Sequence, residues 1–223
     1  MNAPLDLPLV LQPYRHENAQ FGYAPDYPVT EEVYFDNDNR PFILSENGIF
    51  TQRDGEWNET SVGKVVNSKI AFDGENDIYM LATSDGNVAL EHSQDGGKTF
   101  SSTAVPGKGA IELEQFSGHN RPDGPPPIVR YTRTQVDPKL KWRRVHDLDL
   151  FVPTKNADGT LSLGEPIRLS ESCIGISSHS GIPSTIASRG SKVHVTWGEA
   201  TEPAVTVPGV PTYVATYDRD SGI

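Results

Sequence analysis

Hydrophobic and polar residues alternate along much of this chain in short runs that are rich in β-branched side chains. Gly, Pro, Asn and Asp separate these runs, which is the pattern of half-buried β-strands. No stretch shows the sustained periodicity of an amphipathic helix. The alternation predicts an all-β protein with strands in three groups: residues 67–73, 77–83, 88–93 and 99–105, then 127–134, 139–145, 148–154 and 165–170, and finally 184–189, 192–198 and 212–218.

Turns that contain an aspartate recur between these strands. The aspartates are Asp54, Asp95, Asp158 and Asp220. Successive turns lie 41, 63 and 62 residues apart, a spacing that fits β-propeller blades of four short strands. An ordinary β-sandwich is the alternative, because it also has closely spaced strands, but it does not explain regularly spaced Asp-Gly turns.

Residues 93–100, Ser-Gln-Asp-Gly-Gly-Lys-Thr-Phe, contain the most specific turn motif of the chain. Gly96 and Gly97 tolerate positive φ, and the side chains of Ser93 and Asp95 can bond to the backbone of the turn. The octet resembles the Asp box, the BNR repeat of sialidase-like β-propellers, with Phe100 in place of the more usual Trp. The resemblance implies a propeller of four-stranded antiparallel blades, with this turn on the face opposite the active site.

The strand groups divide the chain into a lead-in segment, residues 1–30, and a partial propeller, residues 31–223. Blade three lacks the fourth strand that should follow Asp220, so we expect an incomplete ring with an open, self-associating edge, the N-terminal part of a longer protein. Closure as a small four-bladed ring is the alternative. The expected units are a half-blade at 31–60, blades at 61–105 and 120–170, and an incomplete blade at 180–223.

The composition and net charge of the chain limit the classes of binding partner and bear on its cellular compartment. The formal net charge of −11 disfavours nucleic acid and anionic membrane surfaces as partners. No apolar run has the length of a membrane-spanning helix, and the first residues lack the basic start of a signal peptide. Cys173 is the only cysteine, so no internal disulfide forms.

Two histidines mark the face expected to carry chemistry. His119 precedes the predicted strand at 127–134, and His179 precedes the strand at 184–189, so both are expected in matched loops that lead into innermost strands. Histidine can serve there as a general base, a metal ligand or a loop-bonding side chain. The other candidates are His146 as a metal ligand and, for substrate, Asn120, Arg121, Arg130, Tyr131 and Glu199.

Residues 179–190, 193–199 and 211–219 are similar to the BNR-repeat family that is related to sialidases and to propeller polysaccharide lyases, such as ulvan lyases and rhamnose–glucuronate lyases. The resemblance covers about residues 60–223. It implies β-elimination on a uronate-containing polysaccharide, with His119 as the base and His179 as its partner or a metal ligand. Arg121 or Arg130 would neutralise the uronate carboxylate. The family also suggests a secreted or periplasmic protein.

Other functions stay open at this point. The chain departs from sialidases, because only Arg40-Pro41-Phe42 is available for their first arginine motif. A glycosidase of neutral sugars would need two carboxylates from Glu199, Glu202 and Asp147. A propeller that binds a glycan or a protein without catalysis is the second main hypothesis. The expected partner is a polysaccharide or acidic oligosaccharide, and the cofactors considered are structural Ca or Zn.

Overall fold

The structure is a computed structural model of the 223-residue chain. It describes residues 33–84, 86–107, 111–116, 124–136, 144–174, 184–199 and 211–223. All regular elements in these ranges are β-strands, which confirms the all-β prediction. The described part of the chain contains no helix with the length and hydropathy that a membrane crossing requires.

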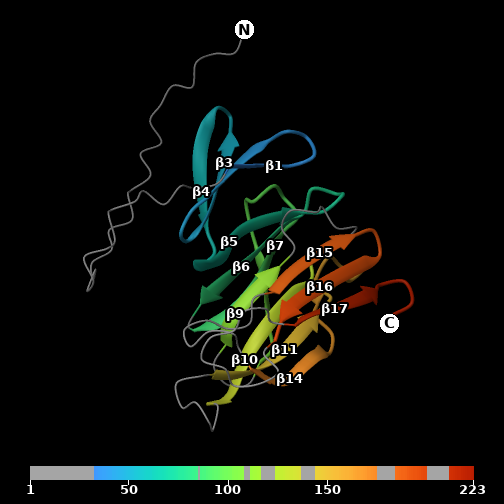
Figure 1. Cartoon of the computed structure of the whole chain (residues 1–223). Coiled ribbons are helices and arrows are strands. Elements are labelled where there is room, and N and C mark those ends of the chain that lie inside the picture. The colour runs from blue at the N-terminus through green and yellow to red at the C-terminus, as the bar shows by residue number, and fades with distance from the viewer. Residues whose placement is uncertain are drawn as a thin grey trace, which may run out of the picture.

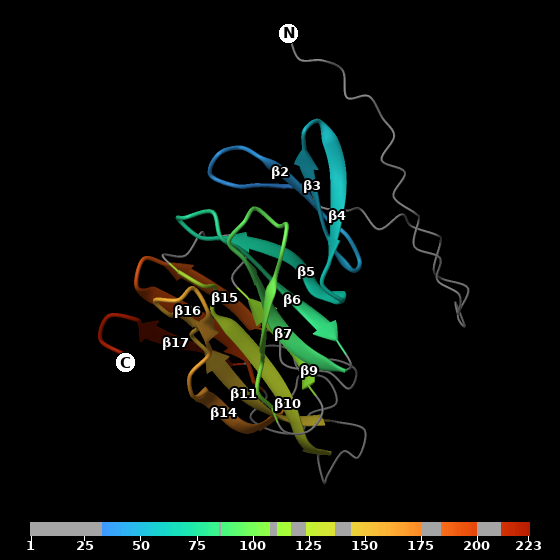
Figure 2. The same cartoon turned by 180° about the vertical axis from the view of Figure 1, so that it is seen from behind.

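Four antiparallel sheets follow one another along the chain and are stacked face to face (Figures 1 and 2). The first sheet contains β1 (Val33–Phe35), β2 (Pro41–Leu44), β3 (Gly48–Arg53) and β4 (Glu56–Ser61). The second contains β5 (Lys64–Phe72), β6 (Ile78–Ser84), β7 (Asn87–Ser93) and β8 (Ser101–Ala104). The strands of both sheets lie in sequence order, so each is a simple meander.

The third and fourth sheets are built in the same way. The third contains β9 (Ile111–Phe116), β10 (Ile128–Val136), β11 (Arg144–Phe151) and β14 (Ile167–Ile174). A small hairpin of β12 (Thr154–Lys155) and β13 (Leu161–Ser162) lies between β11 and β14 in the chain. The fourth contains β15 (Ser184–Arg189), β16 (Lys192–Gly198) and β17 (Thr212–Asp218). No sheet closes into a barrel or ring among the described residues.

Three hydrophobic clusters join the sheets in order. Phe42 and Ile49 of the first sheet pack with Ile78 of the second. The other face of the second sheet packs on β10 and β11 through Ile128, and the far face of β10 packs on the fourth sheet. Alternation along the strands therefore places apolar residues on both faces of the second and third sheets. The first strands of neighbouring sheets also meet, because β9 contacts both β5 and β15.

The Asp turns occupy the predicted positions. Asp54, Asp95 and Asp158 each lie between the third and fourth strands of a sheet, and Asp220 follows the third strand of the last sheet. The predicted side-chain bonds at Asp95 are also present. Its Oδ1 accepts from the backbone N–H groups of Lys98 and Thr99, while Ser93 Oγ accepts from Gly97 N at 2.9 Å.

Each of the last three Asp turns contacts the sheet before it. The Gly97 carbonyl accepts from Thr60 Oγ1 at 2.7 Å and from Arg53 of the first sheet. Gly159 lies against the Gln94 side chain of the second sheet. Arg219, beside Asp220, donates to two carbonyls of the segments that flank β10 and β11. These contacts fasten the stack at the end where the Asp turns lie.

Three predictions about strands are wrong. Residues 31–60 are expected to form half a blade, whereas residues 33–61 contain four strands, of which the first two are only three and four residues long. In the third sheet, β10 is the second strand rather than the first, because β9 precedes it. A single strand, β11, covers 144–151, where the alternation predicts parts of two.

Candidate functional site

His119, Asn120, Arg121 and His179, the core of the predicted catalytic face, lie outside the described residues. The strand that follows His119 differs from the prediction in one respect, because β10 is the second strand of its sheet, whereas the predicted strand at 127–134 is the first. The matched position expected for the two histidines stays a prediction.

Arg130 and Tyr131 point to opposite faces of β10, as neighbours in a strand must. Arg130 is buried against the second sheet, where its Nη2 donates to Asp149 Oδ2 at 3.2 Å and its guanidinium lies 4.8 Å from the Phe151 ring centre. Tyr131 is fully buried in the cluster between the third and fourth sheets. The structure thus does not bring these two predicted substrate residues together. Asp149, moreover, already pairs with the charge of Arg130.

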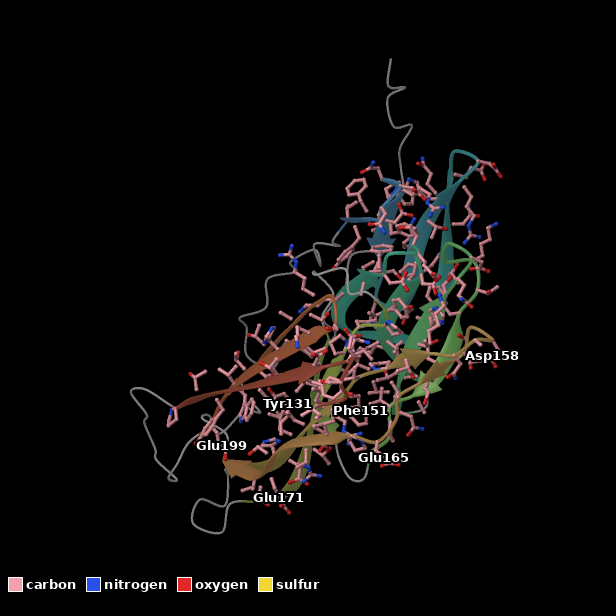
Figure 3. The ribbon with its side chains drawn as sticks, turned by 90° about the vertical axis from the view of Figure 1, so that its right-hand side faces the viewer. Tyr131, Phe151, Asp158, Glu165, Glu171 and Glu199 are labelled. Atoms are coloured by element: carbon pink, nitrogen blue, oxygen red, sulfur yellow. The ribbon has the colours of Figure 1, made fainter. Side chains whose placement is uncertain are left out.

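His146 and Glu199, the other two described candidates, both contact neighbouring side chains of the fold. His146 is fully buried, with its ring edge-on to Tyr131 at 6.2 Å between centroids. Glu199 Oε2 accepts from Ser170 Oγ at 2.8 Å and from the Trp197 indole at 3.3 Å. Figure 3 shows Glu199 at one end of the stack, far from Asp158 at the other. Within the described residues no group of three His, Cys, Asp or Glu side chains is placed to hold a metal ion, so the structure gives the predicted Ca or Zn site no support.

A cavity of about 620 Å³ opens at the end of the stack where the Asp turns lie. Segments of three sheets line it. The turn between β5 and β6 contributes residues 73–75, and the start of the β12–β13 hairpin contributes residues 153–157. Gly124 and Pro125, which lead into β10, and Arg219, which follows β17, complete the wall. Polar groups that are far apart in sequence converge here.

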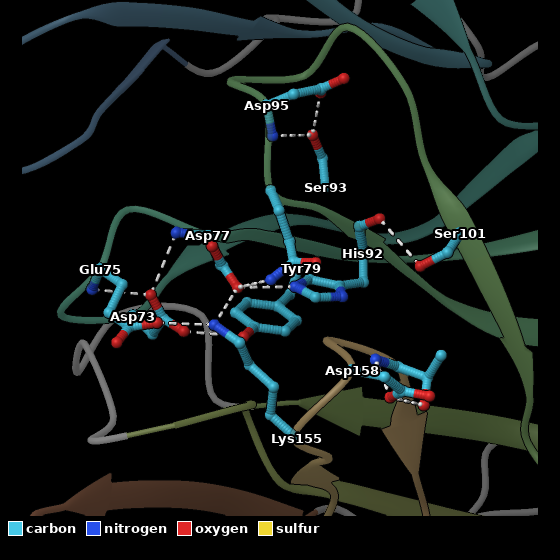
Figure 4. Close-up of polar contacts among 12 residues, drawn as sticks. Asp73, Glu75, Asp77, Tyr79, His92, Ser93, Asp95, Ser101, Lys155 and Asp158 are labelled. Carbon is cyan, nitrogen blue, oxygen red and sulfur yellow. Dashed lines mark hydrogen bonds and ion pairs between the residues drawn. The ribbon is translucent and has the colours of Figure 1, made fainter.

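Lys155 forms the centre of this wall. Its Nζ donates to Glu75 Oε2 at 2.6 Å and to Asp77 Oδ2 at 2.7 Å, and so joins the third sheet to the second (Figure 4). Burial works to lower the pKa of Lys155, but its bonds to the two carboxylates outweigh burial and raise the pKa above its ordinary value. Burial works to raise the pKa of Asp77, and hydrogen bonds from Lys155 and His92 lower it below the ordinary value. The amine and the Asp77 carboxylate are therefore charged at neutral pH.

A buried polar chain continues from Asp77 into the second sheet. His92 Nε2 lies 2.8 Å from Asp77 Oδ2, and its ring stacks on Tyr79 with 4.8 Å between centroids (Figure 4). The Tyr79 hydroxyl donates to Asp73 Oδ2 at 2.7 Å. Burial, followed by this bond to Asp73, raises the pKa of Tyr79 far above its ordinary value, so the phenol stays neutral. The chain holds Asp73 and Asp77 in fixed positions behind the cavity wall.

The opposite side of the cavity is held by Arg219. Its Nη1 donates to the Pro153 carbonyl at 3.2 Å and its Nη2 donates to the Pro125 carbonyl at 2.7 Å. The guanidinium thus ties the fourth sheet to the two segments that flank β10 and β11. It also sets the positions of the backbone at the cavity mouth.

The charges around the cavity balance. Asp73 and Glu75 supply two negative charges, and Lys155 and Arg219 supply two positive charges. Both cations already make short polar contacts, and no histidine or cysteine is among the described lining residues. The cavity wall thus offers carboxylate acceptors and cationic donors close together.

The sequence patterns did not predict the residues that line the cavity, although one repeated turn motif pointed to part of them. Asp36 and Asn39 have the same spacing as Asp73 and Asn76, and both asparagines take positive φ, 59° and 67°. In each turn the aspartate Oδ1 accepts from the backbone N–H groups two and four residues later. This repeated Asp-x-x-Asn turn joins the first and second strands of both sheets. It therefore identifies the segment that supplies Asp73 and Glu75.

Comparison of the chain with known protein families and with curated proteins gives no match. The function is therefore argued from the geometry.

Proposed function

We propose that the chain forms consecutive blades of an Asp-box β-propeller and binds a neutral segment of a polysaccharide, without cleaving it, in the cavity at the Asp-turn end, rather than on the opposite face where the resemblance predicts the site. The stacking of the four sheets supports the propeller part of this proposal. Meandering sheets that pack face to face, with their first strands adjacent, are the arrangement of propeller blades. The position of each Asp turn after the third strand adds to it.

The converging polar wall of the cavity is the observation that carries the binding function. Its volume of about 620 Å³ falls within the range of roughly 300–1,000 Å³ that is usual for small-molecule sites. Sugar hydroxyls donate and accept hydrogen bonds, so they can bond both to carboxylates and to cationic donors. Glu75 and Lys155 offer these two kinds of group side by side, and the Glu75 side chain is 77% exposed.

Electrostatics favours a neutral sugar over a uronate. A uronate carboxylate would approach Asp73 and Glu75, while Lys155 is already bound by Glu75 and Asp77. The net charge of −11 adds a general repulsion for polyanions. The lyase hypothesis stays a prediction for His119 and His179, which are outside the described residues. Of the two arginines that this hypothesis offers for the carboxylate, Arg121 also lies outside the described residues, and Arg130 is buried on Asp149.

A binding panel tests the proposal. Isothermal titration is performed with neutral glucans and galactans on one side and with polygalacturonate and alginate on the other. Ala157 lines the cavity and is exposed, so Ala157→Trp should block binding without disturbing a packed core, and Ala157→Ser is the matched control. Binding of a neutral polysaccharide that Ala157→Trp abolishes and Ala157→Ser preserves supports the proposal.

Three results would overturn it. One is exclusive binding of the polyuronates, and another is unchanged affinity in Ala157→Trp. The third is release of unsaturated, ultraviolet-absorbing sugars from a polyuronate, which would restore the lyase hypothesis.

A further inference from the structure

Lys155 has two carboxylate partners that differ in burial. Its Nζ donates to Asp77 Oδ2 at 2.7 Å and to Glu75 Oε2 at 2.6 Å. The Asp77 side chain is 8% exposed and makes a second contact with His92, whereas the Glu75 side chain is 77% exposed. Exposed ion pairs contribute little to stability. The contact with Asp77 therefore fixes Lys155, and the contact with Glu75 can be exchanged for another.

Glu75 meets Lys155 on the cavity side. Both residues line the cavity, and Asp77 is not among the described lining residues. The turn fixes the backbone of Glu75, because its N–H donates to Asp73 Oδ1 at 2.9 Å. The side chains of Glu75 and Lys155 meet although 80 residues separate them in the chain (Figure 4). An anionic ligand group that bonds to Lys155 from the cavity would need the place that the Glu75 carboxylate holds.

The formal charges show what Glu75 adds to this region. Asp73, Glu75 and Asp77 bring three negative charges, and Lys155 and Arg219 bring two positive charges. Glu75 thus gives the cavity and the wall behind it an excess of one negative charge, and without Glu75 the charges would cancel. Like charges a few ångströms apart repel strongly at the effective dielectric constant near a protein surface. One carboxylate at this position is therefore enough to oppose a second one from a ligand.

We propose that Glu75 is the residue that determines specificity in the cavity. Its carboxylate occupies the position on Lys155 that an anionic ligand group would take, so the chain supplies its own competitor against uronates. A neutral sugar does not compete with Glu75, because hydroxyl groups can bond to the carboxylate itself. This role rests on the proposed function for the nature of the ligand, and it adds that the rejection of acidic sugars comes from one exchangeable side chain.

A purely structural role for Glu75 is the alternative. In that case its carboxylate serves only to hold Lys155 between the second and third sheets. Asp77 already does this from a buried position. The two roles predict different results for Glu75→Gln, because the amide keeps the size of the side chain and removes its charge. A structural role predicts a change in stability, and a specificity role predicts a change in ligand preference.

Isothermal titration with galactan oligosaccharides and oligogalacturonates tests the proposal, since galacturonate carries a carboxylate where galactose has a neutral group. Wild type should prefer the neutral sugar. Glu75→Gln should bind oligogalacturonates at least about tenfold more tightly than wild type, because Lys155 then meets the ligand without a charged competitor. Glu46→Gln is the matched control. It removes one exposed carboxylate from the turn between β2 and β3, outside the described cavity wall, and should leave the preference unaltered.

A double variant tests whether Lys155 is the partner of the ligand carboxylate. Glu75→Gln combined with Lys155→Met should lose the gain for oligogalacturonates, and circular dichroism checks that each variant is folded. The proposal is wrong if Glu75→Gln shows no gain, if Glu46→Gln shows an equal gain, or if the gain survives Lys155→Met. If wild type binds no neutral oligosaccharide but Glu75→Gln gains affinity for oligogalacturonates, the proposed function is wrong and the role of Glu75 stands.

Discussion

The two glycines of the Asp95 turn allow a direct measurement of how strongly the turn is fastened to the first sheet. Both take positive φ, 70° at Gly96 and 80° at Gly97, so an alanine at either position costs about 1–2 kcal/mol in backbone strain. A Cβ at Gly96 would meet no atom within 4 Å. A Cβ at Gly97 would lie 2.6 Å from Ile49 Cδ1 and 3.0 Å from Thr51 Cγ2. Ile49 is fully buried, so its side chain must shift within a packed core, and overpacking adds about 1–3 kcal/mol.

Urea unfolding followed by tryptophan fluorescence measures the difference. We expect Gly96→Ala to lower the free energy of unfolding by about 1–2 kcal/mol and Gly97→Ala to lower it by about 2–5 kcal/mol. The pair shares the same residue change and the same turn, so the excess at Gly97 reports the contact with the first sheet. Equal losses in the two variants would refute that contact as a source of stability.

Three further outcomes follow from the polar contacts. Burial works to raise the pKa of Asp95, but the hydrogen bonds within its turn, chiefly from Thr99, together outweigh burial and lower the pKa to about 2. The contribution of Asp95 to stability should therefore be full above the unfolded pKa of about 3.9. That contribution should fade as the pH falls towards 2. Denaturation at several pH values measures it, because the difference in stability between wild type and Asp95→Asn should shrink over the same pH range. Asp149→Ala should cost about 3–5 kcal/mol in urea unfolding, because it leaves Arg130 buried without its carboxylate; a cost below that of an exposed ion pair would contradict this. Tyr79→Phe should lower stability by about 1–3 kcal/mol in the same assay, since Asp73 loses a buried donor, and an unchanged midpoint would show that water replaces the hydroxyl.

Sequence patterns predicted the second sheet well and the third sheet poorly, for a physical reason. In the second sheet, short apolar strands end at Asp-Gly turns, so local signals and the fold agree. In the third sheet, β11 is buried on both faces. One face is apolar, and the other carries Asp147 and Asp149, which bond to Arg168 of β14. Acidic residues buried by pairing with a distant arginine have the same sequence pattern as residues that face solvent.

The cavity was less predictable than the fold. Residues 73–75, 153–157 and Arg219 belong to three different sheets, and only the stacking of those sheets brings them together. The burial of Arg130 and Tyr131 was hard to predict for a related reason. The sequence shows which residue types are present. Which face of a strand meets a neighbouring sheet depends on the order of the strands, and the unpredicted strand β9 changed that order.

The contacts that fasten the Asp turns have a direction along the chain. Gly97, Gly159 and Arg219 each reach back to a sheet that precedes them, and none depends on a sheet that comes later. Because a ribosome releases the N-terminal sheet first, every receiving surface exists before the turn that binds to it has been synthesised. The stack can therefore assemble during translation, sheet by sheet, and each Asp turn secures one completed step before the next sheet emerges.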